Sequence, residues 1–156
     1  MEDKKLPTVV CFMHLTTGID LVEVKRMKAA VERWGERLLN RVFTPQEIEY
    51  STRGASFYPL RNPRRRRGIP ETCGVSSNMV YQHLAGRFAA KEATIKCLGE
   101  EIKQRPMAWK DIEIVNNSEG KPEIRFNQKK RRNKKRISLT ISHTKDYAVA
   151  QAIAYS

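Results

Sequence analysis

The spacing of hydrophobic residues changes several times along the chain, and each change predicts a different element. Val9 to Val24 is rich in β-branched residues and predicts one strand, or two strand pieces around Thr16. In its second half, Ile19 and Leu21 face one side of the strand, and the residues beside them face the other. After this segment the apolar period lengthens to that of a helix. The expected core stripe of the helical stretch is Val24, Met27, Val31, Trp34, Leu38 and Val42.

Arginines lie off this stripe, at Arg26, Arg33, Arg37 and Arg41. They form either a solvated face or a docking surface for an acidic partner.

A capping box follows at residues 44–47, with a threonine N-cap, Pro45 as the first helical residue and Glu47 as the third. It predicts a short helix through about Tyr50. Ser51 to Ser77 then has no usable periodicity and contains six glycines and prolines. We expect a long, mobile loop inserted in a single domain that covers residues 1–156, because connections of this length are usually functional or disordered.

The second half of the chain predicts a long helix and four strands. The helix is capped by Ser76 or Ser77, runs through Leu98 and stops at Gly99. A linker over residues 100–107, in which a short turn of helix can form, leads to a β-hairpin with strands near 112–115 and 123–126. A basic tract then leads to an alternating strand, 137–142, which should pair with the last strand, 147–155.

The composition supports a folded domain of 156 residues that does not span a membrane. Hydrophobic residues make up 40% of the chain, and no apolar run approaches the length of a membrane span. The apolar run from Val9 to Leu15 is too short for a signal peptide, so we expect a cytoplasmic protein. Cys11, Cys73 and Cys97 lack the spacing of a disulfide framework or a zinc site.

The net charge of +13 is concentrated in two segments. Arg61 to Arg67 holds five basic residues and Arg125 to Arg136 holds eight, with no acid in either. Removing these 13 from the 30 basic residues leaves 17, which balance the 17 acids. Such local excess attracts an anionic partner: nucleic acid, a phosphorylated ligand or a very acidic protein.

Within the long helix, one acid lies on the apolar face that is expected to pack in the core. Glu92 falls on the apolar stripe of Leu84, Phe88 and Ile95. A glutamate there is costly unless a partner neutralises it. That partner is either a neighbouring cation of the same helix or a metal ion.

Two further polar sites lie at strand ends. Asp20 stands between apolar neighbours, either as a cap for the following helix or as a functional acid, and Ser142-His143-Thr144 ends the penultimate strand. Two converging carboxylates with a few waters can hold Mg²⁺, which readily shares its shell with a substrate phosphate. Basic side chains that could donate to phosphate oxygens are Arg87, Lys91, Lys96 and His143.

Three blocks of the sequence resemble one family. They are GIDLVEVKR (residues 18–26), LAGRFAAKEA (84–93) and SLTISHTKDYAVAQA (138–152). They look like the signature blocks of holo-acyl-carrier-protein synthases, the short bacterial type of 4′-phosphopantetheinyl transferase, and they occur in the family's order. The middle block is the most specific of the three.

The resemblance implies an α/β (α+β) fold, with an antiparallel-rich sheet wrapped on a long central helix, assembled as a homotrimer with active sites between subunits. It also implies a Mg²⁺-dependent transfer of 4′-phosphopantetheine from coenzyme A to a serine of an apo acyl carrier protein, which releases adenosine 3′,5′-bisphosphate. Whether the carrier serves fatty-acid or polyketide synthesis is left open.

The same resemblance assigns roles residue by residue. Asp20 and Glu92 match the metal-binding acids, and Lys96 matches the lysine near the diphosphate; these three are the expected catalytic residues. Coenzyme-binding positions are matched by Arg87, Lys96, His143 and Thr144. Arg26 matches the first-helix arginine that meets the carrier, and we place Arg33 on the same docking surface.

These residue types suit the chemistry without the analogy. A diphosphate becomes a leaving group when a cation bridges it and fixed donors meet the developing charge. The proton of the serine could pass to a metal-bound water, to Glu92 or to a group of the carrier.

Two departures from the family pattern concern the ends of the long helix. Relatives usually place basic residues at its start, where this chain has Ser76 to Met79, and the Arg64 to Arg67 run could replace them. The glycine-rich turn that commonly follows the helix is reduced to Gly99. The contacts of that turn with coenzyme A therefore do not carry over.

The main alternative is a nucleic-acid-binding module, supported by the two basic segments. It lacks a recognisable binding motif and leaves Asp20, Glu92 and His143 unexplained. A purely structural protein would explain the arginines of the first helical stretch but not the acids in apolar places.

Overall fold

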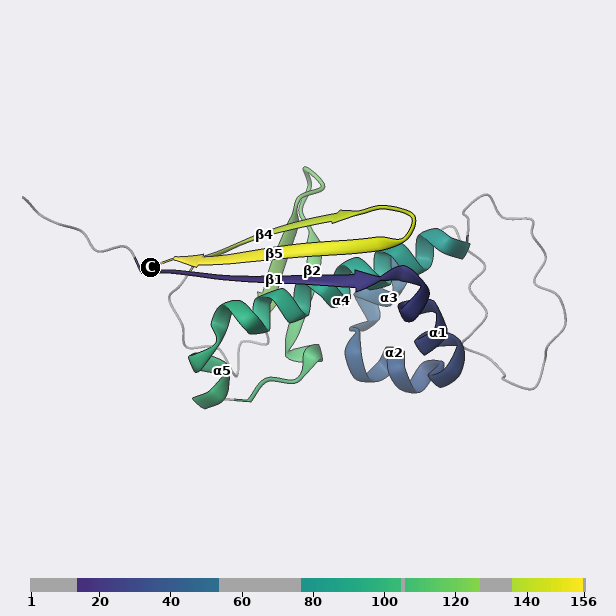
Figure 1. Ribbon diagram of the computed structural model, residues 1–156, viewed down its shortest axis with the longest axis horizontal. Coiled ribbons are helices and arrows are strands. Elements are labelled where there is room, and N and C mark those ends of the chain that lie inside the picture. Colours follow the sequence, from purple (N-terminus) through teal and green to yellow (C-terminus); the bar gives the residue numbers. More distant parts are fainter. Residues whose placement is uncertain (1–13, 54–76, 105, 127–135, 156) are drawn as a thin grey trace, which may run out of the picture.

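The computed structural model describes residues 14–53, 77–104, 106–126 and 136–155. Its larger sheet has three antiparallel strands in the order β1-β5-β4, so β5 lies between the two others (Figure 1). These strands are β1 (Leu15–Glu23), β4 (Arg136–His143) and β5 (Tyr147–Tyr155). The predicted pairing of the last two strands is confirmed, and the antiparallel sheets with helices confirm the α+β class.

The long helix α4 (Ser77–Leu98) packs on one face of this sheet. Every second residue of β5, from Ala148 to Ala154, is a buried alanine, so the helix can approach the strand closely. At Gly18 of β1 the approach is closer still. A Cβ atom there would lie 2.1 Å from the Ala93 carbonyl oxygen and 2.5 Å from the Cys97 nitrogen. Only glycine fits this crossing.

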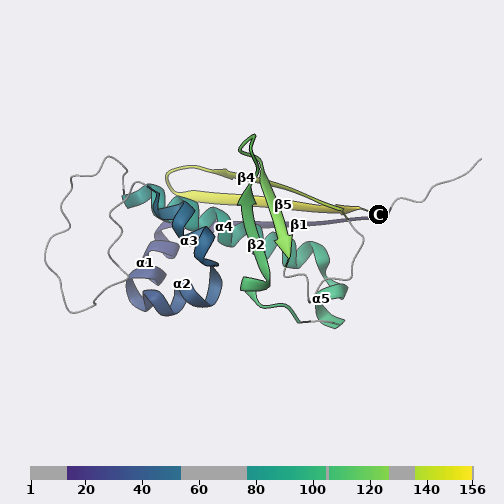
Figure 2. The same cartoon turned by 180° about the vertical axis from the view of Figure 1, so that it is seen from behind.

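A two-stranded hairpin covers the other side of α4 (Figure 2). It is formed by β2 (Ile112–Asn116) and β3 (Pro122–Phe126), as the sequence predicts. Ile112 and Ile114 are fully or almost fully buried against the alanines of α4. The helix thus lies between two apolar layers, which explains why it carries so many small residues.

The first helical stretch differs from the prediction at its middle. It forms two helices, α1 (Val24–Trp34) and α2 (Glu36–Val42), because Gly35 adopts a positive φ of 51° and ends the first helix. The break changes the phase of the apolar stripe. Beyond it Leu39 is fully buried, whereas the predicted core residue Leu38 is only partly buried. Trp34, also predicted in the core, is 51% exposed at the end of α1. The four arginines are exposed, as predicted.

The capping box is confirmed at α3 (Pro45–Thr52), where the Thr44 side chain accepts from the Glu47 nitrogen and Glu47 accepts from the Thr44 nitrogen. The helix includes Ser51 and Thr52, which the prediction gave to the loop. The rest of that predicted loop, residues 54–76, lies outside the described residues, as does the tract from Asn127 to Lys135. Residues 1–13, which include Cys11 and the start of the first predicted strand, also lie outside them.

Two short helices connect α4 to the hairpin: α5 (Glu100–Gln104), where the sequence predicts a linker, and the 3₁₀ helix η1 (Trp109–Asp111). The predicted stop of α4 is confirmed at Gly99, which has a positive φ of 36°. Among the described residues, no helix is long and apolar enough to cross a membrane.

Candidate active site

Asp20 lies on the face of β1 that packs on α4, and its partner is a cation of that helix. Lys96 Nζ is 2.6 Å from Asp20 Oδ1 and also donates to the Ile19 carbonyl oxygen at 3.0 Å. The Asp20 side chain is 17% exposed and that of Lys96 51%. Asp20 is not the cap of the following helix, because the N-cap of α1 is Glu23. The two predicted site residues are therefore in direct contact.

Glu92, one helical turn before Lys96, has a hydrogen-bond partner other than the predicted cation or metal ion. The indole Nε1–H of Trp109 donates to Glu92 Oε1. This donor is neutral, so it brings no positive charge to the carboxylate. Within the described part of the chain, no hydrogen bond or ion pair engages the second oxygen, Oε2.

Lys91 was expected to donate to phosphate, and that expectation is wrong. Its side chain is fully buried, as is that of Glu47, and Lys91 Nζ lies 2.8 Å from Glu47 Oε2. Nζ also donates at 2.9 Å to the carbonyl oxygens of Val42 and Trp109, so all three of its protons are used. Burial lowers the pKa of Lys91, and the charge of Glu47 opposes that shift.

Glu47 is correspondingly more than a helix cap. Besides its ion pair with Lys91, it accepts from the backbone nitrogens of Thr44 at 2.7 Å and Ile114 at 2.9 Å. It therefore ties α3, α4 and β2 together. The sequence signal for this role was the lysine in the buried stripe of α4, which needed an acid from elsewhere.

Arg87 lies five residues before Glu92, on another side of α4, and is only 5% exposed. Its Nη2 donates to Asn116 Oδ1 at 3.2 Å, and its guanidinium carbon lies 3.8 Å from the centroid of the Tyr50 ring. Among the described residues its Nε has no hydrogen-bond partner. Burial lowers the pKa of Arg87, but it remains a cation.

His143 lies next to a histidine that sequence reasoning missed. The rings of His143 and His83 are 6.0 Å apart at an interplanar angle of 76°, and His83 also lies 5.5 Å from the Tyr50 ring. His83 precedes Arg87 by four residues, a spacing that places both on one face of the helix and could have identified it. Burial lowers the pKa of His83, and the charges of Arg87 and His143 lower it further.

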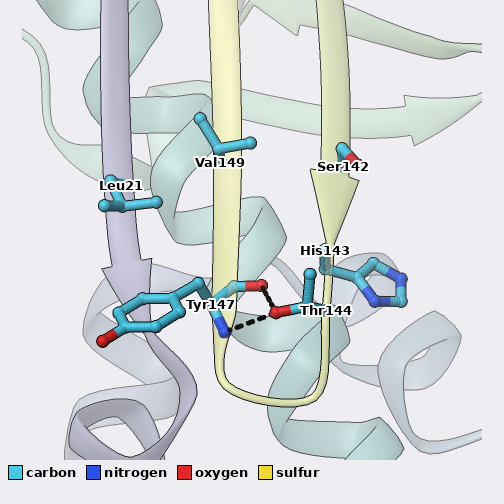
Figure 3. Close-up of a pocket in the computed structure, with 6 residues that line it drawn as sticks. All are labelled: Leu21, Ser142, His143, Thr144, Tyr147 and Val149. Carbon is cyan, nitrogen blue, oxygen red and sulfur yellow. Dashed lines mark hydrogen bonds between the residues drawn. The ribbon is translucent and has the colours of Figure 1, made fainter.

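The turn after β4 is held by Thr144. Its nitrogen donates to the Tyr147 carbonyl oxygen at 2.7 Å. Its hydroxyl accepts from the Tyr147 nitrogen at 3.1 Å and donates to the Tyr147 carbonyl oxygen at 3.5 Å (Figure 3). This turn borders an open hollow of about 320 Å³. Figure 3 shows the His143 ring pointing away from Leu21 and Val149. The hollow is lined by Leu21, Ser142, His143, Thr144, Tyr147 and Val149.

The predicted site residues thus form two groups. Asp20 and Lys96 meet where β1 crosses α4, with Glu92 one turn away on the helix, whereas Arg87 and His143 lie near Tyr50 and His83. Because β5 separates β1 from β4, Asp20 and His143 are on opposite edge strands of the sheet.

The chain is similar to known proteins over most of its length. Residues 16–152 match the family model of the 4′-phosphopantetheinyl transferase superfamily. A holo-[acyl-carrier-protein] synthase of Halothermothrix orenii is 40% identical over 138 residues, covering 85% of this chain and 90% of the relative. The same enzyme of Thermodesulfovibrio yellowstonii is 40% identical over 136 residues, covering 85% and 91%.

The fold is similar to solved structures as well. The holo-(acyl-carrier-protein) synthase of Bacillus anthracis, solved in complex with CoA (3′,5′-ADP), superposes with a TM-score of 0.64 at 26% identity, covering 93% of this chain and 99% of that structure. From the family match and these relatives, the chain belongs to the 4′-phosphopantetheinyl transferase superfamily and, within it, to the holo-[acyl-carrier-protein] synthases.

Proposed function

We propose that this protein transfers 4′-phosphopantetheine from coenzyme A to a serine of an apo acyl carrier protein, with Mg²⁺ as cofactor and adenosine 3′,5′-bisphosphate as the second product. The relatives' activity supports the transfer, and the coenzyme A complex of the Bacillus anthracis relative supports the donor. The structural observation that carries the proposal is the Asp20–Lys96 contact, one helical turn from Glu92. The expected compartment is the cytoplasm.

The residues present fit a Mg²⁺ site. Asp20 already holds a cation, the Lys96 ammonium, and Glu92 has one carboxylate oxygen that the described residues leave unengaged. The described residues include no cluster of three or more metal-ligating side chains. Mg²⁺ does not need one, since it is usually bound by one or two carboxylates together with waters and substrate phosphates. When bound by Asp20 and Glu92, Mg²⁺ would neutralise charge on the diphosphate of coenzyme A.

Lys96 is suited to meet the same diphosphate. Its side chain is half exposed, and an exposed lysine can exchange one anionic partner for another at little cost. We infer that its ammonium moves from Asp20 to a phosphate oxygen when coenzyme A binds, and then stabilises the leaving group. Arg87, His143 and Thr144 are proposed to bind the other phosphate of the coenzyme.

The site is proposed to be shared between copies of the chain in a homotrimer. In one chain the Asp20 group and the His143 group belong to opposite edges of the sheet. We infer that one coenzyme A molecule contacts the Asp20 group of one copy and the His143 group of another. The outer face of the sheet also exposes large apolar side chains. They are Leu15 (55%), Ile19 (60%), Leu21 (63%) and Tyr147 (50%). Such a surface is typical of an interface.

The carrier is proposed to dock on α1. Arg26 and Arg33 are exposed there, and Arg33 lies 4.9 Å from the Trp34 ring centroid, which restrains it. Exposed arginines mainly speed the encounter with an acidic partner and make it sensitive to salt.

The transfer is tested by incubating the protein with coenzyme A, Mg²⁺ and an apo acyl carrier protein. The intact mass of the carrier should rise by one phosphopantetheine, and a carrier with its acceptor serine changed to alanine should gain nothing. An unchanged mass across several carriers, together with tight and salt-dependent DNA binding, would instead favour a nucleic-acid-binding protein.

A further inference from the structure

Trp109 is held by contacts to both its backbone and its ring. Its backbone carbonyl accepts from Lys91 Nζ at 2.9 Å. Its ring lies 5.9 Å from that of Phe88, and the Arg41 guanidinium carbon lies 6.0 Å from its centroid. Trp109 belongs to the short helix η1. The Asp111 carboxylate caps this helix by accepting from the Ala108 nitrogen at 2.8 Å. The direction of the indole N–H is therefore fixed by the surrounding structure.

We propose that Trp109 is a positioning residue that orients the Glu92 carboxylate toward a bound divalent cation. This inference rests on the proposed function. A glutamate on a partly exposed helix face has several accessible rotamers. The indole N–H can only donate, so its bond to Oε1 selects one orientation and leaves Oε2 for a cation.

The neutrality of the donor matters for this role. A lysine or arginine on Glu92 would compete with a metal ion for the same carboxylate, whereas an indole leaves the negative charge in place. Lys91, the residue before Glu92 in α4, does not pair with Glu92 because its ammonium group is paired with Glu47. Its remaining donors hold Val42 and Trp109 in place. Lys91 thus supports Glu92 through the tryptophan rather than by contact with the carboxylate.

The variant Trp109→Phe tests this role, because phenylalanine keeps an aromatic ring beside Phe88 and Arg41 but removes the N–H donor together with part of the indole volume. Outer-shell partners of metal ligands typically contribute about 10- to 100-fold in affinity. We expect Mn²⁺ affinity, measured from the free-ion EPR signal with saturating coenzyme A, to fall about tenfold in Trp109→Phe. Trp34→Phe, which changes the exposed tryptophan, should bind Mn²⁺ like the unaltered protein.

Activity gives a second readout. The Mg²⁺ concentration for half-maximal transfer should rise in Trp109→Phe, and kcat at saturating Mg²⁺ should stay near that of the unaltered enzyme. Unchanged Mn²⁺ affinity in a folded Trp109→Phe protein, or no Mn²⁺ binding by the unaltered protein, would overturn the positioning role. Absence of transfer by the unaltered protein would instead contradict the proposed function, so the two failures are distinguishable.

If Trp109→Phe does not fold, the same contact can be followed without changing it. In Trp34→Phe, Trp109 is the single tryptophan, and its ultraviolet resonance Raman band reports the strength of the indole hydrogen bond. Adding Mn²⁺ and coenzyme A should shift this band, and Glu92→Gln should abolish the shift. If the band does not shift on adding Mn²⁺ and coenzyme A to the Trp34→Phe protein, which retains Glu92, the proposal is overturned.

Discussion

At the scale of single residues, the long helix contains two adjacent charges with opposite surroundings. Lys91 is fully buried and its three donors are all satisfied by Glu47 and two carbonyl oxygens. Glu92 is partly exposed and holds a neutral donor. The first arrangement stabilises the fold, and we propose that the second leaves a carboxylate available to a metal ion.

The buried pair leads to a prediction on stability. Lys91→Met leaves the Glu47 carboxylate buried without its counter-charge, and breaking a buried pair in this way costs about 3–5 kcal/mol. Urea unfolding should show a loss of this size. The double variant Lys91→Met/Glu47→Gln should recover part of it, since the amide oxygen can still accept from Ile114. A single variant as stable as the unaltered protein would contradict the account.

His83 leads to a prediction on pH. Burial, Arg87 and His143 lower its pKa in the folded protein, so the unfolded chain binds a proton more readily. The free energy of unfolding is therefore highest above the unfolded pKa of about 6.5 and falls as the pH drops through that value toward the lower folded pKa. The groups that face His83 are Tyr50, Arg87, His143 and the Ser51 backbone.

Urea unfolding between pH 7.5 and 5.5 measures this dependence. The unaltered protein should lose more stability over the range than His83→Gln, whose side chain does not titrate. Identical slopes for the two proteins would show that His83 carries no part of the dependence. Below pH 5.5 carboxylates titrate as well, so the comparison is restricted to the range between pH 7.5 and 5.5.

At the scale of elements, residue periodicity predicted the strands because each has one buried face. The long helix is buried on two sides, and the serines at its start and Gly99 after it marked its bounds in the sequence. The same reasoning missed the break at Gly35, since the apolar stripe continues in sequence while the positive φ changes its phase. It also missed Trp109 and Glu47 as partners of Glu92 and Lys91. Those contacts join residues 17 and 44 positions apart (109 − 92 and 91 − 47), and only the packing of η1 and α3 on α4 brings them together.

The crossing of β1 and α4 can be tested at Gly18. Gly18→Ala places a Cβ 2.1 Å from a backbone oxygen, so the strand must move away from the helix. We expect a loss of about 3 kcal/mol or more in thermal or urea unfolding, beyond ordinary overpacking. Gly86→Ala is the matched control. Its Cβ would meet only the Ile141 side chain at 3.2 Å, so its effect should be within about 1 kcal/mol. Equal losses would contradict the assignment of Gly18 as the point of closest approach.

At the scale of the whole molecule, the outer face of the sheet exposes large apolar side chains that the rest of the described chain does not cover. Leu21→Glu places a charge among its exposed apolar residues and should prevent assembly. Light scattering should then give the mass of one chain, against three for the unaltered protein. Arg37→Glu, on the exposed face of α2, should keep the larger mass. A single-chain mass for the unaltered protein would contradict the trimer.

The dependence of the transfer on Mg²⁺ and on Asp20 tests the central proposal most directly. The intact mass of an apo acyl carrier protein is followed after incubation with coenzyme A and EDTA-treated enzyme, before and after Mg²⁺ is added. We predict no mass gain in EDTA and full modification after Mg²⁺ addition. In the same assay, Asp20→Asn should be slowed at least about 100-fold while its melting curve is unchanged. Full modification in EDTA, or full activity of Asp20→Asn, would contradict the proposed site.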